Sequence, residues 1–178
     1  MKNGVASNRW LWRLAAANLL LISMMIRFGE PLKTPVSPHG IVSYEFAGTL
    51  ASSQRMLAAW DTPARISAGL SLGLDYLFLV LYGLFLHLAC LKMAAALPEN
   101  SLAGNGWRMA WVPLVAAALD FVENGALVRL LLGAQDELLP KVAQYCASVK
   151  FALVGVTFGY LLVGGAQLLF NRFTRSRS

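Results

Sequence analysis

The longest apolar stretch of the chain is residues 64–97, ARISAGLSLGLDYLFLVLYGLFLHLACLKMAAAL. Its 34 residues exceed the roughly 20 that an α-helix needs to cross the hydrocarbon core of a bilayer, so the helix must tilt, bend or protrude. Asp61, Thr62 and Pro63 precede the stretch, and a capping Asp or Thr followed by proline is a typical helix start. The stretch therefore predicts a long membrane-spanning helix.

Three further apolar stretches, residues 10–26, 107–132 and 138–170, are also long enough to span a bilayer. The first has the charged front of a signal peptide, but no small-residue cleavage site precedes Arg27, which favours an uncleaved span. The chain of 178 residues is 57% hydrophobic and 13% charged, whereas soluble domains carry about 25% charged residues. We therefore expect one all-α membrane domain over residues 1–178, an integral four-helix bundle.

The segment between the first two spans, residues 27–62, is expected to lie outside the membrane. Pro31, Pro35 and Pro38 indicate an irregular loop at its start. From Tyr44 to Trp60 the apolar residues recur close to helical spacing. We expect one amphipathic helix there, which lies on the membrane surface, caps the bundle or is an exposed connector; its Glu45 and Arg55 are either a lid over a cavity or solvated.

The distribution of basic residues predicts the orientation. With the N-terminus inside, eight Lys and Arg fall on the cytoplasmic side and six on the external side, which agrees with the positive-inside rule. Four of the five tryptophans flank the same cytoplasmic interface, as aromatic belts do. We expect a multi-pass protein of the inner membrane with both termini in the cytoplasm. The cytoplasmic set is Lys2, Arg9, Arg13, Lys92, Arg108, Arg172, Arg175 and Arg177; the external set is Arg27, Lys33, Arg55, Arg65, Arg129 and Lys141.

Four ionisable residues lie deep inside the predicted spans, and they are the main candidates for function. They are Asp75, Asp120, Glu123 and Lys150. Each lies between 10 and 13 residues from the external end of its span, roughly 15 to 20 Å below that end at 1.5 Å per residue. A central Asp or Lys costs about 2.5 to 3.5 kcal/mol on insertion scales, so such residues face the bundle interior and find partners. All four could meet in one layer.

The spacing of neighbouring polar residues extends this candidate site. Asp120, Glu123 and Asn124 follow the i, i+3, i+4 pattern, so they share one helix face. Tyr82 shares a face with Asp75. The six residues Asp75, Tyr82, Asp120, Glu123, Asn124 and Lys150 are therefore predicted to line a buried polar cavity that opens toward the external side and binds a small amphiphilic, lipid-like or cationic ligand.

Three carboxylates and one ammonium leave about two excess negative charges in this layer. Protons could balance them, as could Arg55, Arg65 or Arg129 from above, a metal ion, or an amine-bearing ligand. A purely structural interpretation is a buried network of Asp75, Glu123 and Lys150 that sets helix register. A third hypothesis is an intramembrane enzyme with Asp75 and Asp120 as acid and base.

The sequence predicts no cofactor, no metal site and no nucleic-acid partner, and it identifies no catalytic residue. The net charge of +6 comes without a basic stripe, and the cations collect at helix ends. Cys90 and Cys146 lie inside apolar runs, where a packing role is typical. The partners we expect are membrane lipid, the small ligand, and either a membrane-protein partner or a second copy. A non-catalytic subunit or assembly factor of a membrane complex is therefore a further alternative.

Size and span number resemble those of the lipoprotein signal peptidases, which use two aspartates. The surroundings of Asp75 (LGLDYLF) and Asp120 (ALDFVENG) nevertheless lack the asparagine-rich signature of that family. The combination of YEFAGT (residues 44–49), Trp60, LDYLF (residues 74–78) and DFVEN (residues 120–124) resembles a group of small, uncharacterised bacterial four-span membrane proteins. This resemblance implies a four-span fold in a bacterial membrane and carries no activity.

Overall fold

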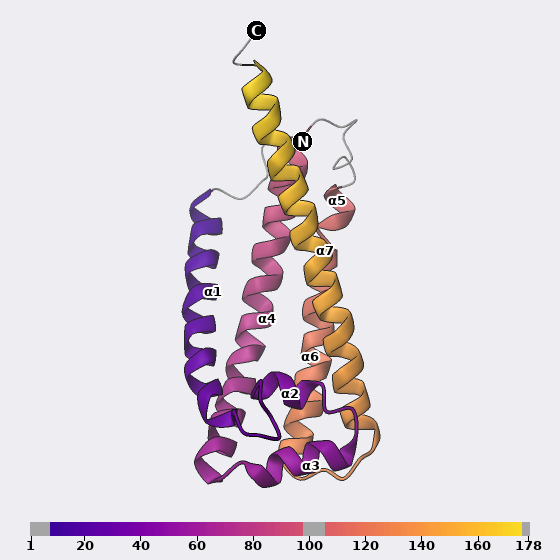
Figure 1. The fold of residues 1–178 in the computed structure, drawn as a ribbon. Coiled ribbons are helices and arrows are strands. Elements are labelled where there is room, and N and C mark those ends of the chain that lie inside the picture. The colour runs from indigo at the N-terminus through magenta and orange to yellow at the C-terminus, as the bar shows by residue number, and fades with distance from the viewer. Residues whose placement is uncertain (1–7, 98–105, 176–178) are drawn as a thin grey trace.

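The structure is a computed structural model that describes residues 8–97 and 106–175, and within these residues every regular element is a helix (Figure 1). Four helices are long: α1 (Asn8–Gly29), α4 (Thr62–Ala96), α6 (Val112–Leu131) and α7 (Leu138–Arg175). Four are short: η1 (Glu30–Leu32), α2 (Ile41–Glu45), α3 (Leu50–Ala59) and α5 (Gly106–Met109). Two cations used to predict orientation, Lys2 and Arg177, lie outside the described residues.

Within the described residues, three stretches of helix are long and apolar enough to cross a membrane, Asn8–Leu32, Thr62–Ala96 and Leu138–Thr174. The all-α prediction is confirmed. The first, second and fourth predicted spans are confirmed as helices with the length and composition of a membrane span. The remaining long helix, α6, has only 20 residues and carries Asp120, Glu123 and Arg129. Its composition alone therefore does not mark it as a span.

The four long helices pack in the order α1, α4, α6, α7. Helix α6 makes its main contacts with α7 and α4, and α1 packs mainly against α4. Figure 1 shows α1 at the edge of the bundle, away from α7. Among the described residues, α1 and α7 do not pack extensively against each other, which leaves one side of the bundle less closed.

The predicted start of the second span is confirmed, but the third span is interrupted. Asp61 caps α4, because its Oδ1 accepts a hydrogen bond of 2.8 Å from the backbone N–H of Ala64. The continuous helix predicted for residues 107–132 is instead divided into α5 and α6 at residues 110–111. Pro113 explains the division, since proline has no N–H to donate to the carbonyl of Met109 and fits only in the first turn of a helix.

The segment between α1 and α4 folds across one end of the bundle, which we call the capped end (Figure 1). The prediction of one helix from Tyr44 to Trp60 is wrong, because residues 46–49 separate α2 from α3. Gly48 in this break has a φ of +69°, a conformation that favours glycine. A Cβ at Gly48 would also lie 2.7 Å from Oε1 of Gln144 on α7.

Buried aromatic side chains hold this segment in place, so its role is to cap the bundle. Tyr44 and Trp60 are fully buried and meet edge to face at 5.2 Å between ring centroids. The indole N–H of Trp60 donates to the carbonyl of Leu32 at 3.0 Å and to Oγ of Ser37 at 3.2 Å. The buried core of the capped end joins these rings to leucines and alanines of α4, α6 and α7.

Candidate functional site

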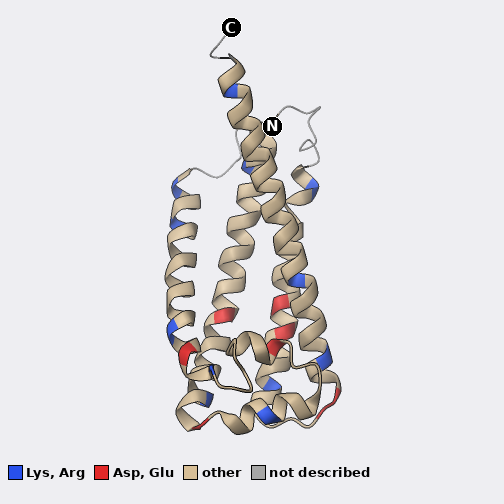
Figure 2. Cartoon of the chain, in the orientation of Figure 1, with Lys and Arg blue, Asp and Glu red and all other residues tan. Residues whose placement is uncertain are grey.

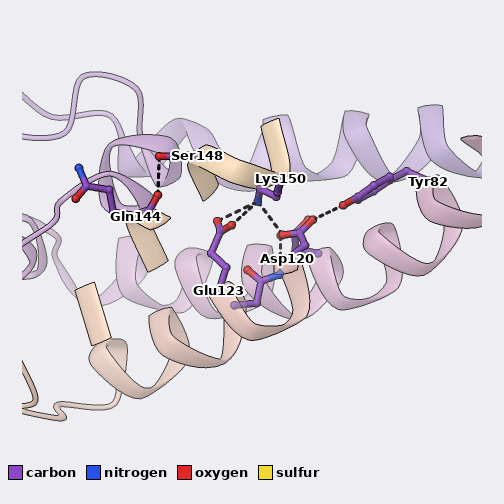
Figure 3. A network of polar contacts seen from close by, with 8 residues as sticks. Tyr82, Asp120, Glu123, Gln144, Ser148 and Lys150 are labelled. Atoms are coloured by element: carbon purple, nitrogen blue, oxygen red, sulfur yellow. Dashed lines mark hydrogen bonds and ion pairs between the residues drawn. The ribbon is translucent and has the colours of Figure 1, made fainter. Parts of the chain in front are cut away.

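Figure 2 shows acidic and basic positions on α6 and α7 near one another. The deep charged residues of these helices meet in a buried ion pair (Figure 3). Nζ of Lys150 donates to Oδ1 of Asp120 at 2.7 Å. It also lies 2.9 Å from both carboxylate oxygens of Glu123. All three side chains are buried. The expectation that these ionisable groups meet at one level is confirmed for Asp120, Glu123 and Lys150.

The polar residues of α4 join this cluster through hydrogen bonds rather than ion pairs. The hydroxyl of Tyr82 donates to Oδ2 of Asp120 at 3.1 Å (Figure 3). Asp75 accepts a 2.7 Å hydrogen bond from the side-chain amide of Asn124. The network predicted between Asp75, Glu123 and Lys150 therefore differs in one member, because Asp120 and not Asp75 shares the ammonium. All six predicted site residues are buried. Their contacts form two groups, Asp75 with Asn124, and Lys150 with Tyr82, Asp120 and Glu123.

A fourth carboxylate, Glu45, reaches the same layer from α2. It is 7% exposed, and its Oε2 is buried without a hydrogen-bond partner in the described part of the chain. Burial raises the pKa of Glu45 to about 7; Lys150 opposes the shift, while the charges of Asp75 and Asp120 add to it. Of the two roles open to Glu45 from the sequence, solvated or above a cavity, the structure supports the second.

The cluster therefore carries more negative than positive charge. Lys150 is the one cation paired with these carboxylates among the described residues. The arginines expected to approach from above do not enter: Arg55 and Arg129 are exposed, and the guanidinium of Arg65 donates to the carbonyls of Leu57 and Trp60. Four carboxylates against one ammonium leave a formal excess of three negative charges when all are ionised. Buried charge of this size must be neutralised by protons or by a bound cation.

A cavity of about 580 Å³ lies beside the cluster, within the range of roughly 300 to 1,000 Å³ typical of small-molecule sites. Its walls are apolar residues of α1 and α7, and α4 and α6 supply its inner surface. Four of the six predicted site residues line it, together with Glu45 and Asn18. Glu123 and Asn124 are fully buried and do not reach the cavity. The predicted residues that line it are Asp75, Tyr82, Asp120 and Lys150.

The sequence predicts a cavity that opens toward the external side, where residues 27–62 lie. In the structure this segment lines the cavity at the capped end instead. Ile41, Val42 and Glu45 of α2 line it at the capped end. It lies between α1 and α7, which do not pack extensively against each other in the described residues. On the α1 side, Oδ1 of Asn18 is buried without a hydrogen-bond partner in residues 8–97 and 106–175. The cavity is thus a lateral cleft with an apolar wall and a polar end.

The geometry does not favour a metal within the cluster. Nζ of Lys150 occupies the position between Asp120 and Glu123 where a bridging cation would lie (Figure 3). In the described ranges, no three His, Cys, Asp or Glu side chains are arranged to hold a metal ion. Cys90 and Cys146 are free and buried.

Fold and site together define the class as a helical protein with three membrane-length apolar helices and a buried cluster of charged residues. No family model matches the chain, and neither a curated protein nor a solved structure shows significant similarity to it. The resemblance to small bacterial four-span proteins stays a prediction.

Proposed function

We propose that α6 is a fourth span and that the chain is a four-span protein of a bacterial inner membrane with both termini in the cytoplasm. Helix packing supports this, because the charged residues Asp120 and Glu123 of α6 are buried against α7. The exposed side of α6 is instead apolar, with Val115, Phe121 and Val122. Arg129, the third charged residue of α6, is exposed in the last turn of the helix, where a long basic side chain can reach the interface, so no deep charge of α6 faces lipid.

Labelling of single cysteines tests the four-span topology. We expect Gln135→Cys, in the exposed turn between α6 and α7, to react with a membrane-impermeant maleimide added outside intact cells. Arg108→Cys, at an exposed position of α5 before the start of α6, should react only after the membrane is permeabilised. The native Cys90 and Cys146 are buried and serve as the background. Reaction of both positions from the same side would contradict the fourth span.

We propose that the protein binds a small amphiphile in the lateral cleft, with its apolar tail between α1 and α7 and its headgroup at the charged cluster. The main support for this proposal is the lining of the cleft. Apolar residues of α1 and α7 line one part of it, and the carboxylates of Glu45, Asp75 and Asp120 line another. A ligand dissolved in the bilayer would reach this cleft sideways. The carboxylate excess favours a cationic headgroup over an anionic one.

An intramembrane enzyme is supported less well by the same residues. Asp75 and Asp120 have different partners, the amide of Asn124 for the first and Lys150 with Tyr82 for the second. An acid and base pair acts on a substrate held between its two members. A non-catalytic subunit is supported less directly than a ligand-binding protein, because the cleft has a volume of about 580 Å³, which is typical of small-molecule sites.

A matched pair of substitutions on α1 tests the cleft. Leu19 and Leu20 are similarly exposed, at 65% and 62%, but only Leu19 lines the cleft in the described structure. The probes are dodecylamine and dodecanol, titrated calorimetrically into the full chain in lipid nanodiscs. We expect Leu19→Trp to weaken probe binding about tenfold because it fills the cleft, while Leu20→Trp binds like the parent. Equal binding by both variants, or none by the parent, would refute the proposal.

A further inference from the structure

The cluster contains two carboxylates, Glu45 and Asp75, that form no ion pair in the described residues, and both line the cleft. Lys150 engages Asp120 and Glu123, and the remaining oxygen of Asp120 accepts from Tyr82. Glu45 and Asp75 are left without a cationic partner among the described residues. These two line the cleft, whereas Glu123 does not.

Two unpaired polar atoms add a second, independent observation. Oε2 of Glu45 and Oδ1 of Asn18 are both buried without a hydrogen-bond partner in the described chain. Each residue is 7% exposed, and both line the cleft. They come from different elements, α2 and α1. A buried acceptor without a donor costs roughly 1 to 3 kcal/mol. Protonated Glu45 can form a side-chain hydrogen bond with Glu123, but ionised Glu45 and Asn18 both lack a donor that a ligand in the cleft could supply.

The chemistry of the missing group follows from the atoms that face it. Carboxylate and amide oxygens accept hydrogen bonds and attract positive charge. A primary or secondary ammonium supplies both N–H donors and charge, whereas a quaternary ammonium has no N–H and a hydroxyl has no charge. The apolar walls of the cleft require that the ammonium carry a hydrocarbon tail.

We propose that Glu45, Asp75 and Asn18 form the headgroup subsite of a lipophilic primary or secondary ammonium, which exchanges with a proton held on Glu45. This inference rests on the proposed function, since it names the ligand class of the same cleft. The O–H bond of the Glu45 carboxyl breaks, its proton leaves to bulk water, and the ammonium forms an ion pair with the carboxylate. No electron is transferred, and the charge of the site is unchanged.

The surroundings of Glu45 suit this exchange. Asp75 faces it from α4, Asp120 and Glu123 from α6, and Lys150 from α7. Burial raises the pKa of Glu45 to about 7, so the group changes its charge near neutral pH. Alkylamines stay protonated in this range, as the ordinary lysine value of about 10.4 indicates. The ammonium therefore enters as a cation at every pH tested.

Calorimetry in two buffers with different ionisation enthalpies measures the exchanged protons. Dodecylamine is titrated into the full chain in lipid nanodiscs, and dodecanol is the neutral probe with the same tail. At a pKa of about 7, we expect roughly 0.5 proton released per bound amine near pH 7 and roughly 0.9 near pH 6. Dodecanol should release none. Release that does not increase toward pH 6 would overturn the exchange.

Three variants assign the exchange to residues. Glu45→Gln should abolish proton release and weaken dodecylamine binding about tenfold, with dodecanol binding unchanged. Asn18→Ala should weaken dodecylamine binding and leave proton release per bound amine intact. Glu137→Gln, which replaces an exposed carboxylate near the start of α7, is the control and should behave like the parent.

The outcomes separate this inference from the proposed function. If both probes bind with similar affinity and without proton release, the cleft is an amphiphile site but the ammonium inference is wrong. Retention of proton release in Glu45→Gln would also overturn it. If neither probe binds the parent, the proposed function itself fails.

Discussion

Replacement of Lys150 by methionine is the sharpest test of the charged cluster. Nζ of Lys150 lies 2.7 Å from one oxygen of Asp120 and 2.9 Å from both oxygens of Glu123. Lys150→Met would leave these three oxygens buried without their cation. Loss of one partner of a buried ion pair costs about 3 to 5 kcal/mol. The unfolding equilibrium constant should therefore rise by roughly two to three and a half orders of magnitude.

Reversible unfolding in mixed micelles, followed by the loss of helical circular dichroism, measures this change. Lys141→Met is the matched control, because Lys141 lies on the same helix and is exposed. Surface substitutions of this kind change stability by at most about 0.5 kcal/mol. A loss in Lys150→Met no larger than in Lys141→Met would refute the buried ion pair.

A combined variant separates charge from packing. Asp120→Asn with Glu123→Gln removes the negative charges that Lys150→Met leaves behind. Replacement of a whole buried charged set is often neutral or stabilising, whereas removal of one member is not. The triple variant should therefore recover most of the stability lost by the single one. Without any recovery, the destabilisation would have to come from lost packing of the lysine side chain.

Three further predictions concern single groups. Tyr82→Phe should destabilise the fold by about 1 to 3 kcal/mol in the same unfolding assay, because Oδ2 of Asp120 loses its 3.1 Å donor; an unchanged midpoint would contradict that bond. Asp61→Ala should cost about 1 kcal/mol, since it removes the cap of α4, while Asp61→Asn should retain most of the stability. Burial raises the pKa of Glu45 from 4.5 to about 7, so its protonated form stabilises the fold fully below about pH 4.5, and this contribution, about 3 kcal/mol, is lost as the pH rises through about 7. Glu45→Gln should flatten the fall in stability between about pH 5 and pH 8, and an unchanged profile would exclude Glu45 as its source.

Much of the fold follows from local features of the sequence. Long apolar runs predict the helices α1, α4 and α7, because twenty apolar residues can satisfy their backbone groups in lipid only as a helix. Asp61 and Pro63 place the start of α4 correctly, since capping is decided within one turn. The depth of Asp120, Glu123 and Lys150 could also be counted along the chain, because each helix residue rises by a constant 1.5 Å.

Local sequence patterns did not determine the tertiary contacts between segments that are far apart in the chain. The division between α2 and α3 depends on Gly48 and on its approach to Gln144 of α7. The short helix α2 then carries Glu45 into a layer otherwise formed by residues at least 30 positions away. Rotation of each helix about its axis decided that Asp120 rather than Asp75 shares Lys150.

The sequence by itself determined that the chain is helical, that it has membrane-length apolar helices and that costly charges lie at one depth within them. Only the tertiary structure decided that α1 packs on α4 and leaves a cleft beside α7, and that Glu45 lines that cleft. The physical reason is that hydrophobicity and helix rise are properties of a single segment. The partners of a buried charge depend on which helix faces it, and that is decided by the packing of the whole bundle.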